Sequence, residues 1–223
     1  MYRHLFEHGG YAELPAGKVV CVGRNYAEHI AELNNETPDE PLLFMKGSNA
    51  LVSFSDTLFI PTNALCHNEI ELAFLIAQPI TCASVEQAHA AIAGVGLALD
   101  LTLRDKQSEL RAKGLPWERA KAFDGSCPVS AFIPSEQLDL QRDMNFSFWV
   151  NDELRQQGCS SQMIWSWSSL IAHISTIFSL YPGDVVLTGT PKGVGPLNPG
   201  DKLKASLNDI LFCSAQVQQE ESR

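Results

Sequence analysis

HNEIELAFLI, residues 67–76, alternates polar and apolar side chains from Glu69 onward and ends as an unbroken apolar run. This pattern is typical of a strand that enters the core of a sheet. Because side chains two residues apart on a strand lie on one face, Glu69 and Glu71 are predicted to converge. Two carboxylates beside a core repel each other and lose hydration, so the pair needs a cation or a shared proton. The alternative is a solvated strand face that carries glutamate at alternate positions.

Asp100 lies in a second apolar stretch, GVGLALDLT at residues 94–102, which is predicted to be a buried strand. A charged side chain in so apolar a run requires a partner. The alternative is that Asp100 caps a helix that begins near Thr102. Hard divalent cations prefer oxygen ligands, and no histidine or cysteine cluster has zinc-like spacing. A site formed by Glu69, Glu71 and Asp100 is therefore predicted to bind Mg2+ or Mn2+ rather than zinc.

The rest of the chain mixes strands, hairpins and a few helices. Apolar residues recur at helical spacing from Tyr26 through Asn34, which predicts a short helix. Towards the C-terminus, Asn208-Asp209 separates two strand-like stretches and indicates a β-hairpin. Predicted strands outnumber helices, and hairpin-like connections outnumber βαβ crossovers. We therefore predict an α+β fold, a folded-over β-sheet or mixed β-roll with a few outer helices.

Length and charge limit the classes of protein to consider. With 223 residues the chain can bury one full hydrophobic core. We expect a single domain over residues 1–223, with an N-terminal extension at about residues 1–17 and a frayed polar tail at residues 218–223. The formal net charge of −10 repels a phosphate backbone, so nucleic acid is not expected as a partner.

The sequence also bears on location. No uninterrupted apolar run reaches the roughly 18 residues that a membrane-spanning helix needs, and the N-terminus lacks the apolar stretch of a signal peptide. The six cysteines are scattered without CxxC spacing, which is typical of buried free thiols in a reducing compartment. We expect a cytoplasmic protein with no membrane partner.

Two further groups of side chains suit catalysis. Lys121 could neutralise a substrate oxyanion or a metal-ligand carboxylate; the alternative is a surface lysine paired with Glu118 or Asp124. His29 and Glu32 lie three residues apart on the predicted helix and share a face, as a base and the group that orients it would. The alternative for this pair is a solvated helix face.

A loop rich in glycine and threonine, TGTPKGVG at residues 188–195, follows a predicted buried strand. Its backbone N–H groups are suited to binding a carboxylate. The loop lacks the Walker pattern, so a nucleotide is not predicted to bind there.

At these residues the sequence resembles the fumarylacetoacetate hydrolase superfamily, specifically its small acylpyruvase and oxaloacetate decarboxylase-like branch. Five blocks carry the resemblance, in order and almost end to end: VCVGRNYA (20–27) with His29, Glu69-x-Glu71-Leu72, ALDLTLRD (98–105), Pro116-Trp117-Glu118 through KAFD (121–124), and GDVVLTGTP (183–191). Five matches in the right order are much more specific than any one motif.

The resemblance implies a role for each matching position. Glu69, Glu71 and Asp100 match the family's ligands for Mg2+ or Mn2+. Lys121 matches its active-site lysine, and His29 with Glu32 matches a dyad on a mobile lid helix that activates the attacking water. The positions that match substrate-binding residues are Arg24, Lys46, Arg104, Gln107 and Thr190. The last three match contacts to the substrate's carboxylate and keto groups.

The resemblance also implies an activity. The expected enzyme is a divalent-metal-dependent hydrolase that cleaves a C–C bond in acylpyruvate or fumarylpyruvate-type β-diketo acids, through an enolate that the metal stabilises. Oxaloacetate decarboxylation and keto–enol tautomerisation or isomerisation at the same site are alternatives. A non-catalytic scaffold that binds carboxylates is another. The expected partner is a small keto-acid substrate, and the expected assembly is a homodimer.

The chain departs from the family's pattern at two positions. Relatives often carry two histidines before the first glutamate, and here the second of these positions is Asn68. The lysine that corresponds to Lys46 is usually followed by proline, and here it is followed by Gly47. The first departure is expected to alter the surroundings of the metal ligands, and the second the shape of the entrance.

Overall fold

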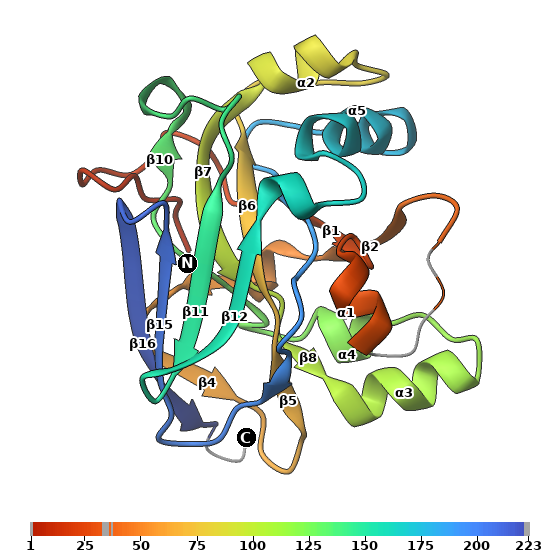
Figure 1. The fold of residues 1–223 in the computed structure, drawn as a ribbon, viewed down its shortest axis with the longest axis vertical. Helices are drawn as coiled ribbons and strands as arrows, with labels where there is room; N and C mark the ends of the chain where they lie inside the picture. Colours follow the sequence, from red (N-terminus) through yellow and green to blue (C-terminus); the bar gives the residue numbers. More distant parts are fainter. Residues whose placement is uncertain (1, 33–35, 37, 221–223) are drawn as a thin grey trace.

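A computed structural model describes residues 2–32, 36 and 38–220, and within them the strands form three sheets (Figure 1). The largest has the order β2 (Leu42–Lys46), β1 (Val19–Gly23), β13 (Val185–Leu187), β6 (Ile70–Ile76), β7 (Ile92–Leu99), β9 (Cys127–Val129) and β3 (Leu51–Ser53), with β10 (Ile133–Pro134) also on β7. The second has the order β12 (Glu153–Cys159), β11 (Asn145–Val150), β15 (Lys202–Leu207), β16 (Leu211–Gln219) and β4 (Ser55–Ile60). The third is β14 (Gly195–Pro196), β5 (Cys66–Asn68) and β8 (Thr102–Leu103).

Strand β6 lies in the middle of the largest sheet and is buried on both faces. Leu72 and Phe74 belong to a core cluster that also contains side chains of the second sheet, such as Phe148. Ala73 and Leu75 belong to a separate cluster on the opposite face. The apolar run that follows the two glutamates is therefore explained by packing on both sides of one strand.

The N-terminal residues cover the second face of the largest sheet. Tyr2 and Phe6 pack on the cluster that contains Leu75 and Phe132. The backbone N–H of Phe132 donates to the carbonyl of Leu5 at 2.8 Å, which fixes this segment to the sheet. Residues 2–16 thus contribute to one of the two apolar clusters.

Five α-helices lie outside the sheets in the described part of the chain. They are α1 (Ala27–Glu32), α2 (Val85–Ala90), α3 (Arg104–Ala112), α4 (Glu118–Lys121) and α5 (Trp167–Ile177). Short 3-10 helices cover Ser48–Ala50, Ser135–Gln137 and Ser160–Gln162. Figure 1 shows α1, α3 and α4 grouped on one side of the molecule, beside β5 and β8, with α2 and α5 together at one end. None of the helices described is long and apolar enough to cross a membrane.

The strand predicted over residues 94–102 is interrupted at Asp100 and Leu101. Strand β7 ends before this break, and β8 continues after it in the three-stranded sheet. The antiparallel partner is interrupted at the same level, because β5 ends at Asn68 and β6 begins at Ile70. At this corner the chain passes between the three-stranded sheet (β5 and β8) and the largest sheet (β6 and β7). The backbone N–H of Asp100 donates to the carbonyl of Glu69 at 2.8 Å across the corner.

The predicted α+β class with curled sheets and few helices is confirmed. The hairpin prediction is also confirmed, since Asn208 and Asp209 have positive φ angles between β15 and β16. The predicted fraying is wrong for Gln218 and Gln219, which extend β16 and pair with β4. Residues 221–223, and positions 33–34 of the predicted helix, lie outside the described residues.

Candidate active site

Three buried carboxylates converge at the corner between the sheets. One oxygen from each of Glu69, Glu71 and Asp100 lies within 4.8 Å of the others. The exposed fractions of these residues are 6%, 1% and 1%, respectively. Glu71 lies on β6, whereas the other two lie at the two strand breaks. The predicted convergence of Glu69 and Glu71, and the partner required by Asp100, are therefore present.

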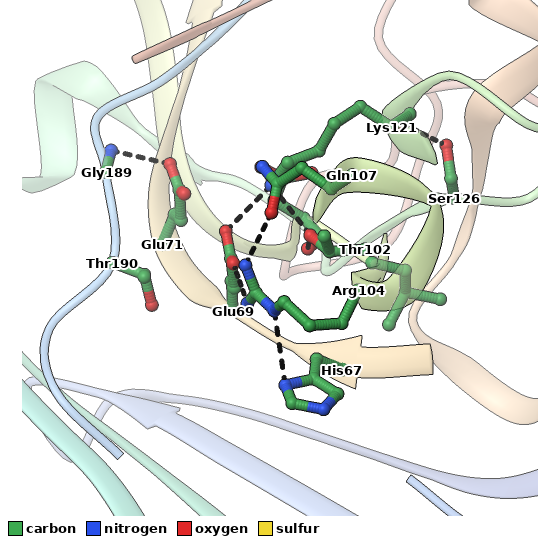
Figure 2. A network of polar contacts seen from close by, with 12 residues as sticks. His67, Glu69, Glu71, Thr102, Arg104, Gln107, Lys121, Ser126, Gly189 and Thr190 are labelled. Carbon is green, nitrogen blue, oxygen red and sulfur yellow. Dashed lines mark hydrogen bonds and ion pairs between the residues drawn. The ribbon is translucent and has the colours of Figure 1, made fainter. Parts of the chain in front are cut away.

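Lys121, the last residue of α4, points into this cluster (Figure 2). Its Nζ donates to Glu69 Oε2 at 2.9 Å, to Asp100 Oδ2 at 2.6 Å and to Thr102 Oγ1 at 2.7 Å. Burial alone lowers the pKa of Lys121, but the carboxylates of Asp100 and Glu69 raise it above its ordinary value. The alternative of a surface lysine is wrong, because only 2% of Lys121 is exposed.

Two other cations each bind one carboxylate of the cluster. Lys46 Nζ lies 2.8 Å from Asp100 Oδ1, and Arg104 Nη2 lies 2.5 Å from Glu69 Oε1. Burial raises the pKa of Glu69, but Lys121 and Arg104 outweigh it and hold that pKa below its usual range. Lys46 is fully buried, does not line the cavity and also donates to the carbonyl of Ser126. Its position behind Asp100 differs from the predicted contact with substrate.

Glu71 lacks such compensation. Its Oε2 accepts a hydrogen bond from the backbone N–H of Gly189 at 2.6 Å, and it forms no ion pair with any side chain in the described part of the chain. Burial, Asp100 and Glu69 together raise its pKa well above the ordinary value. A buried carboxylate in this position needs a proton or a cation. The three carboxylates, with oxygen donors only, fit a hard divalent ion such as Mg2+ or Mn2+.

A cavity opens onto the acid cluster. Beyond the cluster and Lys121, it is lined by residues that include Arg24, His29, Arg104, Gln107, Trp117 and Thr190. Figure 2 shows the carboxylate of Glu69 between Lys121 and Arg104, with Thr190 on the opposite side. Arg104 Nη1 also donates to Gln107 Oε1 at 2.7 Å, so these two predicted substrate contacts are already held together.

The predicted dyad is present on α1. His29 Nδ1 lies 3.1 Å from Glu32 Oε2, and the other carboxylate oxygen accepts from the backbone N–H of Gly193 at 3.0 Å. Only 6% of His29 is exposed, and its ring lines the cavity. Glu32 therefore orients the imidazole and also joins α1 to the loop at residues 188–195.

Sequence reasoning missed Gln156, a buried glutamine on β12. Its Oε1 accepts from Nδ2 of Asn68, the first departure from the family's pattern, at 2.8 Å. No sequence signal distinguished Gln156, since Gln157 follows it directly and only the alternation of the strand separates them. The second departure, Gly47, has a φ of −74°, so its backbone conformation does not require glycine.

Known proteins similar in sequence and structure match most of this chain. The family model described as "Fumarylacetoacetate (FAA) hydrolase C-terminal" matches residues 18–218. Oxaloacetate tautomerase YcgM of Escherichia coli (strain K12) is 48% identical over 210 residues, covering 93% of this chain and 96% of that protein. The mitochondrial oxaloacetate tautomerase FAHD1 of Homo sapiens is 40% identical over 206 residues, covering 91% and 92%. The crystal structure of fumarylpyruvate hydrolase from Pseudomonas aeruginosa in complex with Mn2+ and pyruvate has a TM-score of 0.91 at 36% identity, covering 97% of this chain and 95% of that one.

Proposed function

This chain belongs to the fumarylacetoacetate hydrolase family, and the relatives named above are enzymes that act on keto acids. We propose that this protein catalyses keto–enol tautomerisation of oxaloacetate. The cofactor proposed is Mg2+ or Mn2+, bound by Glu69, Glu71 and Asp100. The cluster of three buried carboxylates, with Glu71 lacking a cationic partner among the described residues, carries this proposal. The names of two relatives favour the tautomerase alternative over the C–C hydrolase that was expected first. A homodimer is proposed on the resemblance alone.

The reaction moves one proton between carbon and oxygen. In the keto form of oxaloacetate a water molecule acting as base takes the proton from the carbon next to the ketone, negative charge develops on the keto oxygen, and the protonated water returns a proton to that oxygen, so the net proton count is unchanged. A divalent cation held by the three carboxylates would act as a Lewis acid on the keto oxygen and stabilise this charge. Lys121 adds a fixed positive charge at the same place, 2.6 Å from Asp100 Oδ2.

The substrate's carboxylates require donors on the cavity wall. Arg104 Nη1 donates to Gln107 Oε1 at 2.7 Å, and both side chains extend from α3 and line the cavity. Thr190 lines the cavity from the opposite segment, and Arg24 and His29 line it as well. We assign Arg104, Gln107 and Thr190 to the carboxylate and keto groups beside the metal.

Removal of the metal tests the proposal directly. We expect exhaustive chelation to lower oxaloacetate tautomerisation by at least about a hundredfold, because loss of Lewis-acid stabilisation costs several kcal/mol. Added Mg2+ or Mn2+ should restore the rate. The enol absorbs in the ultraviolet, so the rate can be followed spectrophotometrically against the spontaneous reaction.

As controls, the chelated protein is assayed after addition of Ca2+ in place of Mg2+ or Mn2+, and without any added metal. Full activity after chelation would exclude the proposed metal centre. Tight binding of Mn2+ without any turnover would favour the non-catalytic scaffold instead.

Hydrolysis of acylpyruvates is a second candidate activity, favoured by the His29–Glu32 pair. Water must lose a proton to attack the distal carbonyl, and an imidazole held by a carboxylate is suited to accept it. The 3.1 Å contact between the two side chains leaves His29 Nε2 available to such a water. The similarity to a fumarylpyruvate hydrolase supports this reading.

His29→Ala separates the two activities. We expect acylpyruvate hydrolysis to fall by about 100-fold to 10,000-fold, the range for loss of a general base. Tautomerisation needs no water nucleophile, so it should fall by less than about tenfold. Parallel assays on acetylpyruvate and oxaloacetate, with Glu28→Ala on the same helix as the control, measure both. Equal losses in both assays would assign His29 to a step that the reactions share.

A further inference from the structure

Gln156 connects the segment that carries Glu69 to the segment that carries Thr190. Only 1% of this glutamine is exposed. Its Oε1 accepts hydrogen bonds from Asn68 Nδ2 at 2.8 Å and from the backbone N–H of Ile70 at 3.0 Å. Its Nε2 donates to Thr190 Oγ1 and to the carbonyl of Pro191, both at 2.8 Å. The amide thus uses both acceptor sites and both donor hydrogens.

Two partners of this amide flank Glu69, one member of the acid cluster. Asn68 and Ile70 are the two chain neighbours of Glu69, at the corner where the strand changes sheets. Thr190 Oγ1 in turn donates to the carbonyl of Ile70 at 2.8 Å. Three hydrogen bonds therefore close a ring through Ile70, Gln156 and Thr190, and this ring fixes the cavity wall relative to the corner.

The amide of Gln156 links the two segments where the backbone pairing of β13 with β6 ends. Strand β13 pairs with β6, and the backbone N–H of Thr188 continues this pattern to the carbonyl of Leu72 at 3.3 Å. Beyond Thr188 the two segments are linked by a side chain, because Thr190 Oγ1 donates to the carbonyl of Ile70 at 2.8 Å, and Pro191, the next residue, has no N–H to donate. Gln156 instead accepts from Ile70 and donates to Pro191, as a neighbouring strand would.

The backbone at Gly193 lies against the backbone of β12 at Arg155, which keeps Gln156 within hydrogen-bonding distance of the loop. Gly193 has a φ of +98°, and a Cβ built there would lie 1.8 Å from the carbonyl oxygen of Arg155. Only glycine allows this contact without displacement. The loop at residues 188–195 therefore rests directly on β12, one residue from Gln156.

We propose that Gln156 is a positioning residue that sets Glu69 and Thr190 at a fixed separation, so that the bound cation and the keto acid are held together. The inference rests on the proposed function, since it takes Glu69 as a metal ligand and Thr190 as a substrate contact. Substitution of groups behind metal ligands commonly costs about 10–100-fold in metal affinity. Asn68, the last residue of β5, donates to Gln156 and does not line the cavity, so we expect it to act through Gln156.

The test compares Gln156→Met with Gln157→Met. Methionine nearly matches glutamine in volume but has no amide, and Gln157 is the exposed neighbour on the same strand. Mn2+ affinity is measured calorimetrically on folded, metal-free protein well below its melting temperature, and KM for oxaloacetate is measured at saturating Mn2+. We expect Gln156→Met to weaken Mn2+ binding by at least about tenfold and to raise KM. Gln157→Met should change both by less than twofold.

Two further variants cover the case in which Gln156→Met does not fold. Gln156→Asn keeps an amide that is one methylene too short to reach all four partners, and it should shift Mn2+ affinity in the same direction. Asn68→Ala removes a single partner and should have a smaller effect, which disappears in a Gln156→Asn background. A lower melting temperature with unchanged Mn2+ affinity and KM would show a purely structural role and overturn the inference. If wild-type protein bound no Mn2+, the proposed function itself would fail.

Discussion

Glu71→Gln is expected to abolish metal binding while raising the stability of the metal-free protein. Glu71 is buried beside Asp100 and Glu69, which repel its charge, and it accepts a hydrogen bond from the backbone N–H of Gly189. A glutamine keeps that hydrogen bond through its carbonyl and turns an amide donor towards the other two carboxylates. Relief of buried charge is worth about 1 kcal/mol or more, which corresponds to a rise of roughly 2–4 °C per kcal/mol in a chain of this size.

The expected loss of metal affinity in Glu71→Gln is large. One of three charged oxygen ligands disappears, so we expect Mn2+ affinity to fall at least about a hundredfold and turnover to fall with it. Melting curves in chelator and in Mn2+ measure both effects on the same protein. Glu109→Gln, on the exposed face of α3 between Lys106 and Lys113, is the matched control and should change neither. A lower melting temperature in chelator would contradict the account of Glu71.

Lys121→Met is expected to have the opposite effect on the metal-free protein. It removes the ammonium that donates to Glu69, Asp100 and Thr102 and leaves two carboxylates with less compensation in a buried site. Breaking a buried ion pair from one side costs about 3–5 kcal/mol. That predicts a melting temperature lower by roughly 10 °C in chelator. Because a divalent ion replaces the missing positive charge, Mn2+ should restore more stability to this variant than to the wild type.

Turnover should not return with stability. Lys121 supplies charge at the place where negative charge develops, and loss of such a group typically costs about 100–1,000-fold in rate. Lys113→Met removes an exposed lysine that pairs only with Glu109 among the contacts described, and it serves as the control. An active, Mn2+-loaded Lys121→Met protein would leave this lysine with a structural role alone.

The sequence predicted the acid cluster because two simple rules applied. Side chains alternate along a strand, which placed Glu69 and Glu71 on one face, and a charge in an apolar run needs a partner, which singled out Asp100. The same rules missed the break between β7 and β8. Backbone corners depend on how one sheet meets another, and no local pattern near Asp100 encodes that.

The lysines show where residue type alone is insufficient. Lys121 looked like a surface residue beside Glu118, yet α4 is one turn long and turns its last side chain inwards. Lys46 matched a substrate-binding position, yet it lies behind Asp100 with no exposed surface. A lysine's long stem can reach in several directions, so only the three-dimensional packing decides which charge it meets.

The N-terminal segment has a practical consequence for expression. The family model matches from residue 18, but Tyr2 and Phe6 lie upstream and pack on the cluster that contains Leu75 and Phe132. A protein truncated to residues 18–218 would expose this apolar face of the sheet to solvent, and we expect it to aggregate. Truncation designs should therefore keep the first residues, and purification tags are better placed elsewhere.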